Sequence, residues 1–174
     1  MILLYILILG ITALYISTAL VSLILRVPYV PTKKSVMRKI MKETIIKKGE
    51  TFLDLGCGDG RMLIEAEKQN NVNVEGYEIA PMIYLMAMLR KLVNKSKAKI
   101  HFKNFFKEDL NHGDVIFCYL MPHELVKLAK KIKKECNKGT RIISNTFKIK
   151  GLTPVKIIPK DEQNKIPTLY FYEI

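Results

Sequence analysis

The sequence has 174 residues, which is room for one domain of ordinary size. Hydrophobic residues make up 49% of it and charged residues 26%, and this composition excludes a chain that is disordered throughout. Lysine and arginine total 29 against 16 aspartate and glutamate, a formal net charge of +13, and no charged residue precedes Arg26. The chain therefore divides into an uncharged apolar N-terminus and a strongly basic remainder.

The cysteines and histidines show no pattern typical of a disulfide framework or a metal site. The cysteines are far apart in the sequence, and the histidines lack the short spacing of zinc ligands. We therefore predict neither disulfides nor a bound metal. These residues are Cys57, Cys118, Cys136, His101, His112 and His123.

The N-terminal segment predicts a transmembrane helix. Residues 2–25 carry no charge, and about 20 apolar residues suffice to cross the hydrocarbon core of a bilayer. A secretory signal would have a basic start and a small-residue cleavage site, which the segment lacks. A buried core helix is disfavoured because the segment is apolar on every face. We expect an uncleaved membrane anchor.

Basic residues that follow the apolar segment predict its orientation. Positively charged flanks remain in the cytoplasm, so the N-terminus should lie outside and the globular part should face the cytoplasm at the cell membrane. Juxtamembrane lysines also attract anionic lipids, at about 1 kcal/mol each when close to the surface. The flank contains Arg26, Lys33, Lys34, Arg38, Lys39, Lys42, Lys47 and Lys48.

The remaining chain alternates between predicted helices and strands. Pro28 and Pro31 keep residues 27–32 extended, and a helix capped by Thr32 or Ser35 should follow and reach about Ile46. Further helices are predicted over 61–69, 81–93 and 122–136, with a turn at 70–71. Strands are predicted over 51–55, 72–79, 98–102, 114–119, 141–146, 154–158 and 168–172.

Repeated strand–helix–strand units predict an α/β fold with a doubly wound, mostly parallel sheet of seven strands. The last two strands have no helix between them, so they should pair as an antiparallel hairpin at one edge. We divide the chain into a transmembrane anchor (residues 1–25), a proline-containing segment (26–34) and an α/β domain (35–174). In such a sheet, ligands bind beyond the carboxyl ends of the strands, where the winding reverses.

Three glycines after the first strand of this domain predict the ligand site. Gly56, Gly58 and Gly60 let the backbone turn sharply and come close to a ligand. Glu78 ends the next strand about 20 positions after the loop, where a carboxylate can bind both hydroxyls of a ribose. The sequence therefore predicts a ribose-containing ligand.

The same loop disfavours phosphate groups. Its G-x-G-x-G pattern has Arg61 in the place of the third glycine of a dinucleotide motif, and the G-K-S/T of a P-loop is missing. Asp54 and Asp59 add negative charge, which suits a cationic or zwitterionic ligand better than a pyrophosphate. We expect a ligand with a ribose and no phosphates.

The segment from Asp54 to Gly60, followed by Glu78, resembles the cofactor motif of class I S-adenosylmethionine-dependent methyltransferases. The resemblance extends over about residues 35–174 and implies a Rossmann-like methyltransferase fold. In that family the glycine loop holds the methionine end of the cofactor, and the acidic residue holds the ribose. The resemblance also implies an adenine near residues 104–105 and the reactive methyl beside Tyr119. The implied cofactor-binding residues are Asp54, Gly56, Gly58, Asp59, Gly60, Glu78, Ile79, Asn104, Phe105 and Tyr119.

Three shorter segments resemble one subgroup of that class: residues 28–32 (PYVPT), 104–106 (NFF), and 139–141 (GTR) leading into Ser144 and Phe147. The subgroup contains archaeal protein-lysine methyltransferases and membrane-anchored mitochondrial enzymes that methylate lysines of the ATP synthase c-ring and of the adenine nucleotide carrier. There the PYVPT segment folds over the cofactor and the substrate channel. Two positions depart from the sequence pattern of the subgroup: Lys33 stands where the pattern has a further proline, and Asn145 stands where it has a histidine.

The resemblance implies a membrane-anchored, S-adenosylmethionine-dependent methyltransferase of protein lysines near the cytoplasmic membrane face. A lysine must lose its proton before it accepts a methyl group, because its ordinary pKa is near 10.4. Burial and a neighbouring sulfonium charge lower that pKa, so neutral groups suffice to hold the amine. The candidates for this catalytic role are Tyr29, Tyr119 and Asn145.

Four other residues lie near the predicted site. We expect Phe105 and Phe147 as apolar walls or core residues. His123 and Glu124 begin a helix near the site, where surface positions are expected first and a contact with the substrate is the alternative. The expected partners are a protein with an exposed lysine, such as a membrane protein, and the lipid bilayer through the N-terminal helix.

Two alternative functions remain open. The same cofactor could serve a small or lipid-like acceptor, or the chain could be a non-catalytic membrane module that binds nucleotide or nucleic acid. Nucleic acid is disfavoured because the lysines are scattered with few interleaved aromatic residues.

Overall fold

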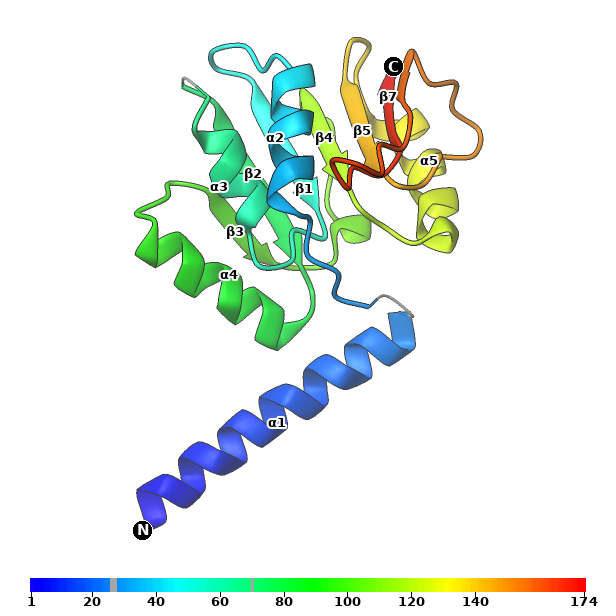
Figure 1. Cartoon of the computed structure of the whole chain (residues 1–174). Coiled ribbons are helices and arrows are strands. Elements are labelled where there is room, and N and C mark those ends of the chain that lie inside the picture. Colours follow the sequence, from blue (N-terminus) through cyan, green and yellow to red (C-terminus); the bar gives the residue numbers. More distant parts are fainter. Residues whose placement is uncertain (26–27, 70) are drawn as a thin grey trace.

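A seven-stranded sheet forms the centre of the structure, a computed structural model that describes residues 1–25, 28–69 and 71–174 (Figure 1). The first two residues of the predicted segment 26–34 and the first residue of the predicted turn at 70–71 lie outside the described residues. Across the sheet the order is β3-β2-β1-β4-β5-β7-β6. The strands are β1 (Thr51–Leu55), β2 (Asn73–Glu78), β3 (Lys99–Phe102), β4 (Val115–Cys118), β5 (Arg141–Asn145), β6 (Lys156–Ile158) and β7 (Leu169–Glu173).

Strand directions confirm the predicted fold class. β1 pairs in parallel with β2 and β4, and parallel pairing continues to β3 on one side and β5 on the other. β7 pairs antiparallel with both β5 and β6, so it lies inside the sheet while β6 forms the edge. The winding reverses between β1 and β4, which places the expected ligand crevice beyond their carboxyl ends.

Helices cover the sheet on both faces (Figure 1). α2 (Lys34–Glu43) and α3 (Arg61–Glu67) pack together on one face, and α4 (Pro81–Val93) packs beside α3 against β2 and β3. α5 (Pro122–Glu135) contributes its apolar side to the core of the opposite face. Consecutive residues of β1 alternate between these two cores, since Phe52 faces α2 and α3 while Leu53 faces α5.

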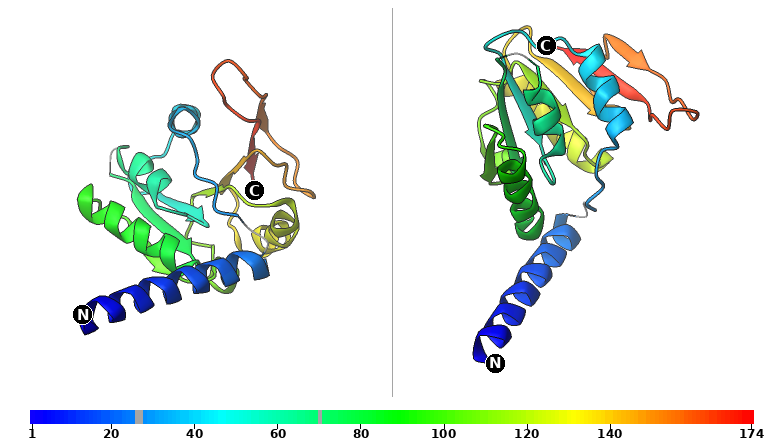
Figure 2. Two further views of the ribbon diagram at one scale, coloured as in Figure 1. Left: turned by 60° about the horizontal axis from the view of Figure 1, so that its bottom comes forward. Right: turned by 60° about the vertical axis from the view of Figure 1, so that its left-hand side comes forward.

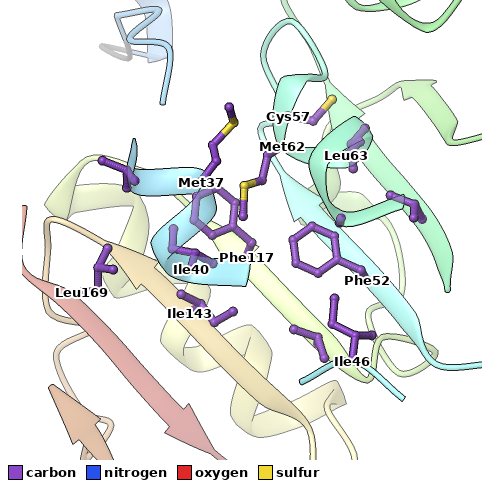
Figure 3. Close-up of a cluster of buried hydrophobic side chains, with 14 of the residues drawn as sticks. Met37, Ile40, Ile46, Phe52, Cys57, Met62, Leu63, Phe117, Ile143 and Leu169 are labelled. Carbon is purple, nitrogen blue, oxygen red and sulfur yellow. The ribbon is translucent and has the colours of Figure 1, made fainter. Parts of the chain in front are cut away.

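The core under α2 and α3 is built from side chains of these two helices and of the sheet (Figure 3). Ile40 and Phe52 are fully buried, and the Phe52 and Phe117 rings stack with centroids 6.5 Å apart. This packing fixes β1 and β4 side by side, and so fixes the loops that follow them.

The helix predicted to reach Ile46 ends at Glu43, and neither Thr32 nor Ser35 caps it. The reason is a contact distant in sequence: the Gln69 carboxamide donates to the carbonyls of Met41 and Thr44 at 3.1 and 3.3 Å. It also accepts from the Ile46 backbone N–H at 3.2 Å. Gln69 thereby satisfies polar groups that a longer helix would have paired internally.

α1 (Ile2–Leu25) forms as one continuous helix, and it extends away from the domain (Figures 1 and 2). Its residues Ile2–Ile24 are long and apolar enough to cross a membrane, and the apolar window is not buried in the protein. The helix touches the domain at α4, where the Thr18 hydroxyl oxygen accepts a 2.8 Å hydrogen bond from the Met82 backbone N–H.

Candidate active site

A pocket lies beyond the carboxyl ends of β1, β2 and β4. The loop after β1, the start of α4, residues 28–32 and the end of α1 all contribute to its wall. The structure brings ten of the predicted site residues to this pocket and leaves Gly60 and Asn145 outside its lining. The ten are Tyr29, Asp54, Gly56, Gly58, Asp59, Glu78, Ile79, Asn104, Phe105 and Tyr119.

The loop between β1 and α3 depends on glycine because its backbone is left-handed at three positions. Gly56, Gly58 and Gly60 have φ angles of +78°, +56° and +74°. A Cβ on Gly58 would lie 3.1 Å from the Tyr29 ring, so the missing side chain also lets residues 28–32 close over the loop. The loop is fastened to the neighbouring strand by two backbone hydrogen bonds of about 3 Å from Gly56 and Cys57 to the Tyr77 carbonyl.

The carboxylate of Glu78 is held in place by three backbone donors. One oxygen accepts from the Gly58 N–H at 2.9 Å, and the other accepts from the Ile79 and Ala80 N–H groups at 2.8 Å each. Burial raises the pKa of Glu78, although these hydrogen bonds act in the opposite direction. A carboxylate accepts about four hydrogen bonds, so one site remains for a ligand hydroxyl at the pocket wall.

Asp54 is a buried carboxylate that has no hydrogen-bond or ion-pair partner among the described residues. Its exposure is 2%, and no donor in the described part of the chain binds it, yet it borders the pocket. Burial raises its pKa well above the usual range, and the charges of Glu78 and Asp59 raise it further. A cationic group in the pocket would relieve this cost, and the ammonium and sulfonium of S-adenosylmethionine are such groups. The residues present therefore fit that cofactor.

Asp59 behaves differently, although it belongs to the same loop. Its carboxylate is 2.7 Å from the guanidinium groups of both Arg61 and Arg90. Burial alone would raise its pKa, but the hydrogen bonds and charge of Arg61, with the charge of Arg90, hold it below the usual value. Asp59 therefore carries the negative charge expected of the loop, but two arginines compensate it.

The two arginines are the site residues that sequence reasoning missed. Arg61 also donates to the Thr32 carbonyl at 3.3 Å, which ties residues 28–32 to the loop. Burial and the neighbouring Asp59 raise the pKa of Tyr29, so its phenol keeps its proton. For Arg61, the sequence held one signal of a role at the site, which is its position in the place of a third glycine. For Arg90, the sequence held no such signal.

The adenine side of the predicted site is formed after β3. The Asn104 side chain accepts a 3.0 Å hydrogen bond from the Phe106 N–H and thereby starts the short helix η1 (Phe105–Lys107), which was not predicted. Phe105 is nearly buried, and its ring is tilted by 37° against that of Phe106 at a centroid distance of 4.2 Å. Phe147 also borders the pocket.

Glu124 differs from its expected place at the surface. Its exposure is 6%, and it lines the pocket from the first turn of α5, where Lys127 donates to it at 3.1 Å. The amphipathic helix turns this residue inward together with Leu125 and Leu128.

A second hollow adjoins the first, with Tyr119 bordering both. Asn145 lines this second hollow at the end of β5, beside the end of β4 that Tyr119 follows. Its carboxamide oxygen accepts from the Thr146 hydroxyl at 3.2 Å. Thr146 has a φ angle of +72°, which is unusual for a β-branched residue and fixes the chain direction next to Asn145. Tyr29 and Tyr119 thus line the first pocket, whereas Asn145 lines the adjoining hollow, which Tyr119 also borders.

Residues 54–156 match the family described as the ANTKMT methyltransferase domain. A protein-lysine N-methyltransferase of Saccharolobus islandicus is 34% identical over 151 residues, which cover 85% of this chain and 94% of the relative. The adenine nucleotide translocase lysine N-methyltransferase of Mus musculus is 28% identical over 79% of this chain, and the ATP synthase c-subunit lysine N-methyltransferase of Homo sapiens is 26% identical over 73%. The matches span 61% and 54% of those two mammalian relatives.

Solved structures share the fold. An RNA methyltransferase from Salinibacter ruber in complex with S-adenosyl-L-homocysteine superposes with a TM-score of 0.77 at 24% identity, covering 83% of this chain and 94% of that one. Fibrillarin from Aeropyrum pernix with bound S-adenosyl-L-methionine gives a TM-score of 0.62 at 11% identity, covering 79% and 72%.

The protein is an S-adenosylmethionine-dependent methyltransferase. This class is defined here by the order of the strands, by the glycine loop after β1 and by the acidic residues Asp54 and Glu78 at the pocket, and the family match agrees. When bound, the cofactor supplies an electrophilic methyl group. The chain belongs to the ANTKMT methyltransferase-domain family.

We expect the affinity for S-adenosylmethionine to increase with pH. Asp54 and Glu78 have raised pKa values in the free protein, and a cationic ligand favours their ionised forms, so binding should release protons. Because ionisation at higher pH destabilises the ligand-free fold, the thermal stabilisation by the cofactor should also increase with pH. Calorimetry in buffers of different ionisation enthalpy measures the release, and Asp54→Asn should reduce it and weaken binding about tenfold or more. Equal affinity at all pH values with no proton release would contradict the assignment.

Gly58→Ala should weaken cofactor binding, whereas Gly49→Ala should not. Both glycines have positive φ, so both substitutions cost about 1–2 kcal/mol of backbone strain. Only the Cβ at Gly58 meets Tyr29, while that at Gly49 meets nothing within 4 Å. Titration of both variants with the cofactor, after denaturant unfolding has matched their stabilities, separates the effects. Equal losses of affinity would show that strain alone acts.

Proposed function

We propose that this protein transfers methyl groups from S-adenosylmethionine to lysine side chains of proteins. The observation that carries the proposal is the match to the archaeal protein-lysine N-methyltransferase, which extends over 94% of that relative. The names of the two mammalian relatives point to the same acceptor group. The hollow beside Tyr119 provides a separate place for an acceptor next to the cofactor pocket.

In this proposal, the acceptor amine lies between Tyr119 and Asn145. Both side chains are neutral, and each can accept a hydrogen bond from an amine. Neither would stabilise an ammonium as a carboxylate does, so these two groups favour the deprotonated lysine. The charged residues that line the rest of the hollow have both signs: Lys33, Lys160, Lys165, Asp161 and Glu162. Tyr29 keeps its proton because its pKa is raised, so its role is to close the pocket and orient the ligand rather than to act as a base. Most of the gain in rate would come from positioning the amine for an in-line attack.

We also propose that α1 anchors the enzyme in the cell membrane, with its N-terminus outside and the catalytic domain in the cytoplasm. The apolar length of Ile2–Ile24 and the basic residues after it support this orientation. The chain would then consist of an anchor (1–25), a cofactor-covering segment (26–34) and a catalytic domain (35–174). An anchored enzyme meets substrates of the same membrane at a raised local concentration.

The acceptor is identified by a labelling experiment. The full-length protein is incubated with S-adenosylmethionine that carries a radioactive methyl group and with membrane extract from the cells that produce it. Acid hydrolysis should yield labelled methyl-lysine, and a Gly58→Val variant should yield none. Label that is extractable into organic solvent would favour a lipid-like acceptor, and cofactor binding without transfer would favour a non-catalytic module.

Variants of Asn145 test its role at the amine. Asn145→Ala should lower kcat about tenfold, because one positioning hydrogen bond is lost, while the dissociation constant of the cofactor stays unchanged. Asn145→Asp should stabilise the ammonium and raise the pKa of the bound lysine, so the pH–rate profile should move to higher pH. Steady-state kinetics over a pH series measures both effects. A profile that keeps its position in the aspartate variant would remove Asn145 from contact with the amine.

A further inference from the structure

α4 carries apolar side chains on two separate faces. Ile83 and Ala87 are buried against the domain, as expected for a helix that packs on a sheet. A second set recurs with the period of a helix on another face, so it forms one continuous stripe, which we call the outer stripe. Apart from Met82, its members are among the exposed large hydrophobic residues, with exposures from 39% to 79%. The outer stripe consists of Met82, Leu85, Met86, Leu89, Leu92 and Val93.

The outer stripe begins where α1 touches the domain. Met82 is its first residue, and its backbone N–H donates to Thr18 of α1. α4 lies on the side of the sheet that faces α1, and it runs across α1 rather than along it (Figures 1 and 2). If α1 spans a membrane, α4 therefore does not follow it through the bilayer.

The position of Thr18 sets the depth of this contact. About 10 Å of helix separates Thr18 from the end of α1 at Leu25, at 1.5 Å per residue. Leu20, Leu23 and Ile24 in this stretch are at least half exposed, so the protein does not cover them. If lipid covers them, the apolar part of the bilayer reaches nearly to Leu25, and the start of α4 lies below that level. Interfacial helices are inserted to about this depth, 5–10 Å.

We propose that the outer stripe of α4 is inserted at the boundary between lipid headgroups and acyl chains, as a second membrane contact beside α1. This inference rests on the proposed membrane insertion of α1. Charge supports a lipid surface as the partner, because Lys91, Lys95 and Lys97 follow along the same end of α4, and Lys33 and Lys34 follow α1. Lysines in this arrangement bind anionic headgroups.

The contact also restricts the substrate. The cofactor pocket is bordered by Val21 and Ser22 of α1 and by Ile83 of α4, so it lies beside the two elements that would touch the bilayer. Its acceptors are then lysines of membrane proteins at the level of the headgroups, rather than lysines of proteins in solution.

The depth of α4 is measured with the full-length protein in vesicles of phosphatidylcholine and phosphatidylglycerol. Fluorophores are attached to Leu89→Cys or, as a matched control, to Ile157→Cys on the opposite edge of the sheet; the two positions are 56% and 51% exposed. Both variants carry Cys136→Ser, because Cys57 and Cys118 are buried and Cys136 is partly accessible. Lipids with a nitroxide in the upper acyl chain should quench the label at position 89 severalfold more than the label at 157.

Equal quenching at both positions in vesicle-bound protein would overturn the inference. Shielding of the label at 89 that depends on protein concentration and not on lipid would also overturn it, in favour of a second copy of the chain. Failure of the protein to float with vesicles would reject both membrane contacts. In every case, cofactor binding and lysine methylation in detergent test the proposed function separately.

A second variant tests the stripe without a label. Leu89→Glu combined with Leu92→Glu places charges on exposed positions that contact neither pocket. The variant should float with vesicles through α1 and methylate a soluble lysine peptide at the unchanged rate. It should methylate a membrane-spanning peptide with a lysine at the headgroup level several times more slowly. Unchanged rates on both peptides would contradict the proposed contact.

Discussion

The buried carboxylate of Asp59 joins the parts of the chain that form the pocket. It belongs to the glycine loop after β1, and it binds Arg61 at the start of α3 and Arg90 near the end of α4. Through Arg61 it also holds the carbonyl of Thr32, and its charge acts on the phenol of Tyr29. Loss of both arginines would leave a buried, uncompensated charge, which costs about 3–5 kcal/mol. The covering segment and α4 therefore depend on the same ion-pair network as the loop itself.

Three acidic side chains at this edge of the sheet have different tasks because their surroundings differ. Asp59 is paired with two arginines, and its pKa is lowered. Glu78 is oriented by backbone N–H groups, and burial still raises its pKa. Asp54 has no partner among the described residues, and its pKa is raised most clearly by burial. Pairs of titratable groups whose environments separate their pKa values are typical of sites that bind or transform a ligand. A positive charge on the ligand would therefore stabilise the carboxylate of Asp54 most, since that group has no partner among the described residues.

Local signals in the sequence were sufficient for the strands, the glycine loop and Glu78. Short apolar runs between turns and helices predicted the strands, and alternating strands and helices predicted the parallel sheet. The end of α2 could not be predicted, because it depends on Gln69, which is distant in sequence. The pairing of Asp59 with Arg90 could not be predicted for the same reason, since nothing near Asp59 in the sequence indicates that partner. Glu124 was misplaced because a charged residue in a first helical turn usually faces water. The roles of Tyr29, Tyr119 and Asn145 stay predictions.

The connection of β2 to α4 determines which edge of the sheet lies next to α1. Only two residues separate Glu78 at the end of β2 from Pro81 at the start of α4, so the start of α4 must lie at the carboxyl edge of the sheet. Ligands bind at that edge in any sheet of this topology. An apolar helix that packs on the start of α4, as α1 does through Thr18 and Met82, therefore brings the pocket to its own side. The short connection thus places the start of α4, and with it the contact with α1, at the edge of the sheet where the pocket lies.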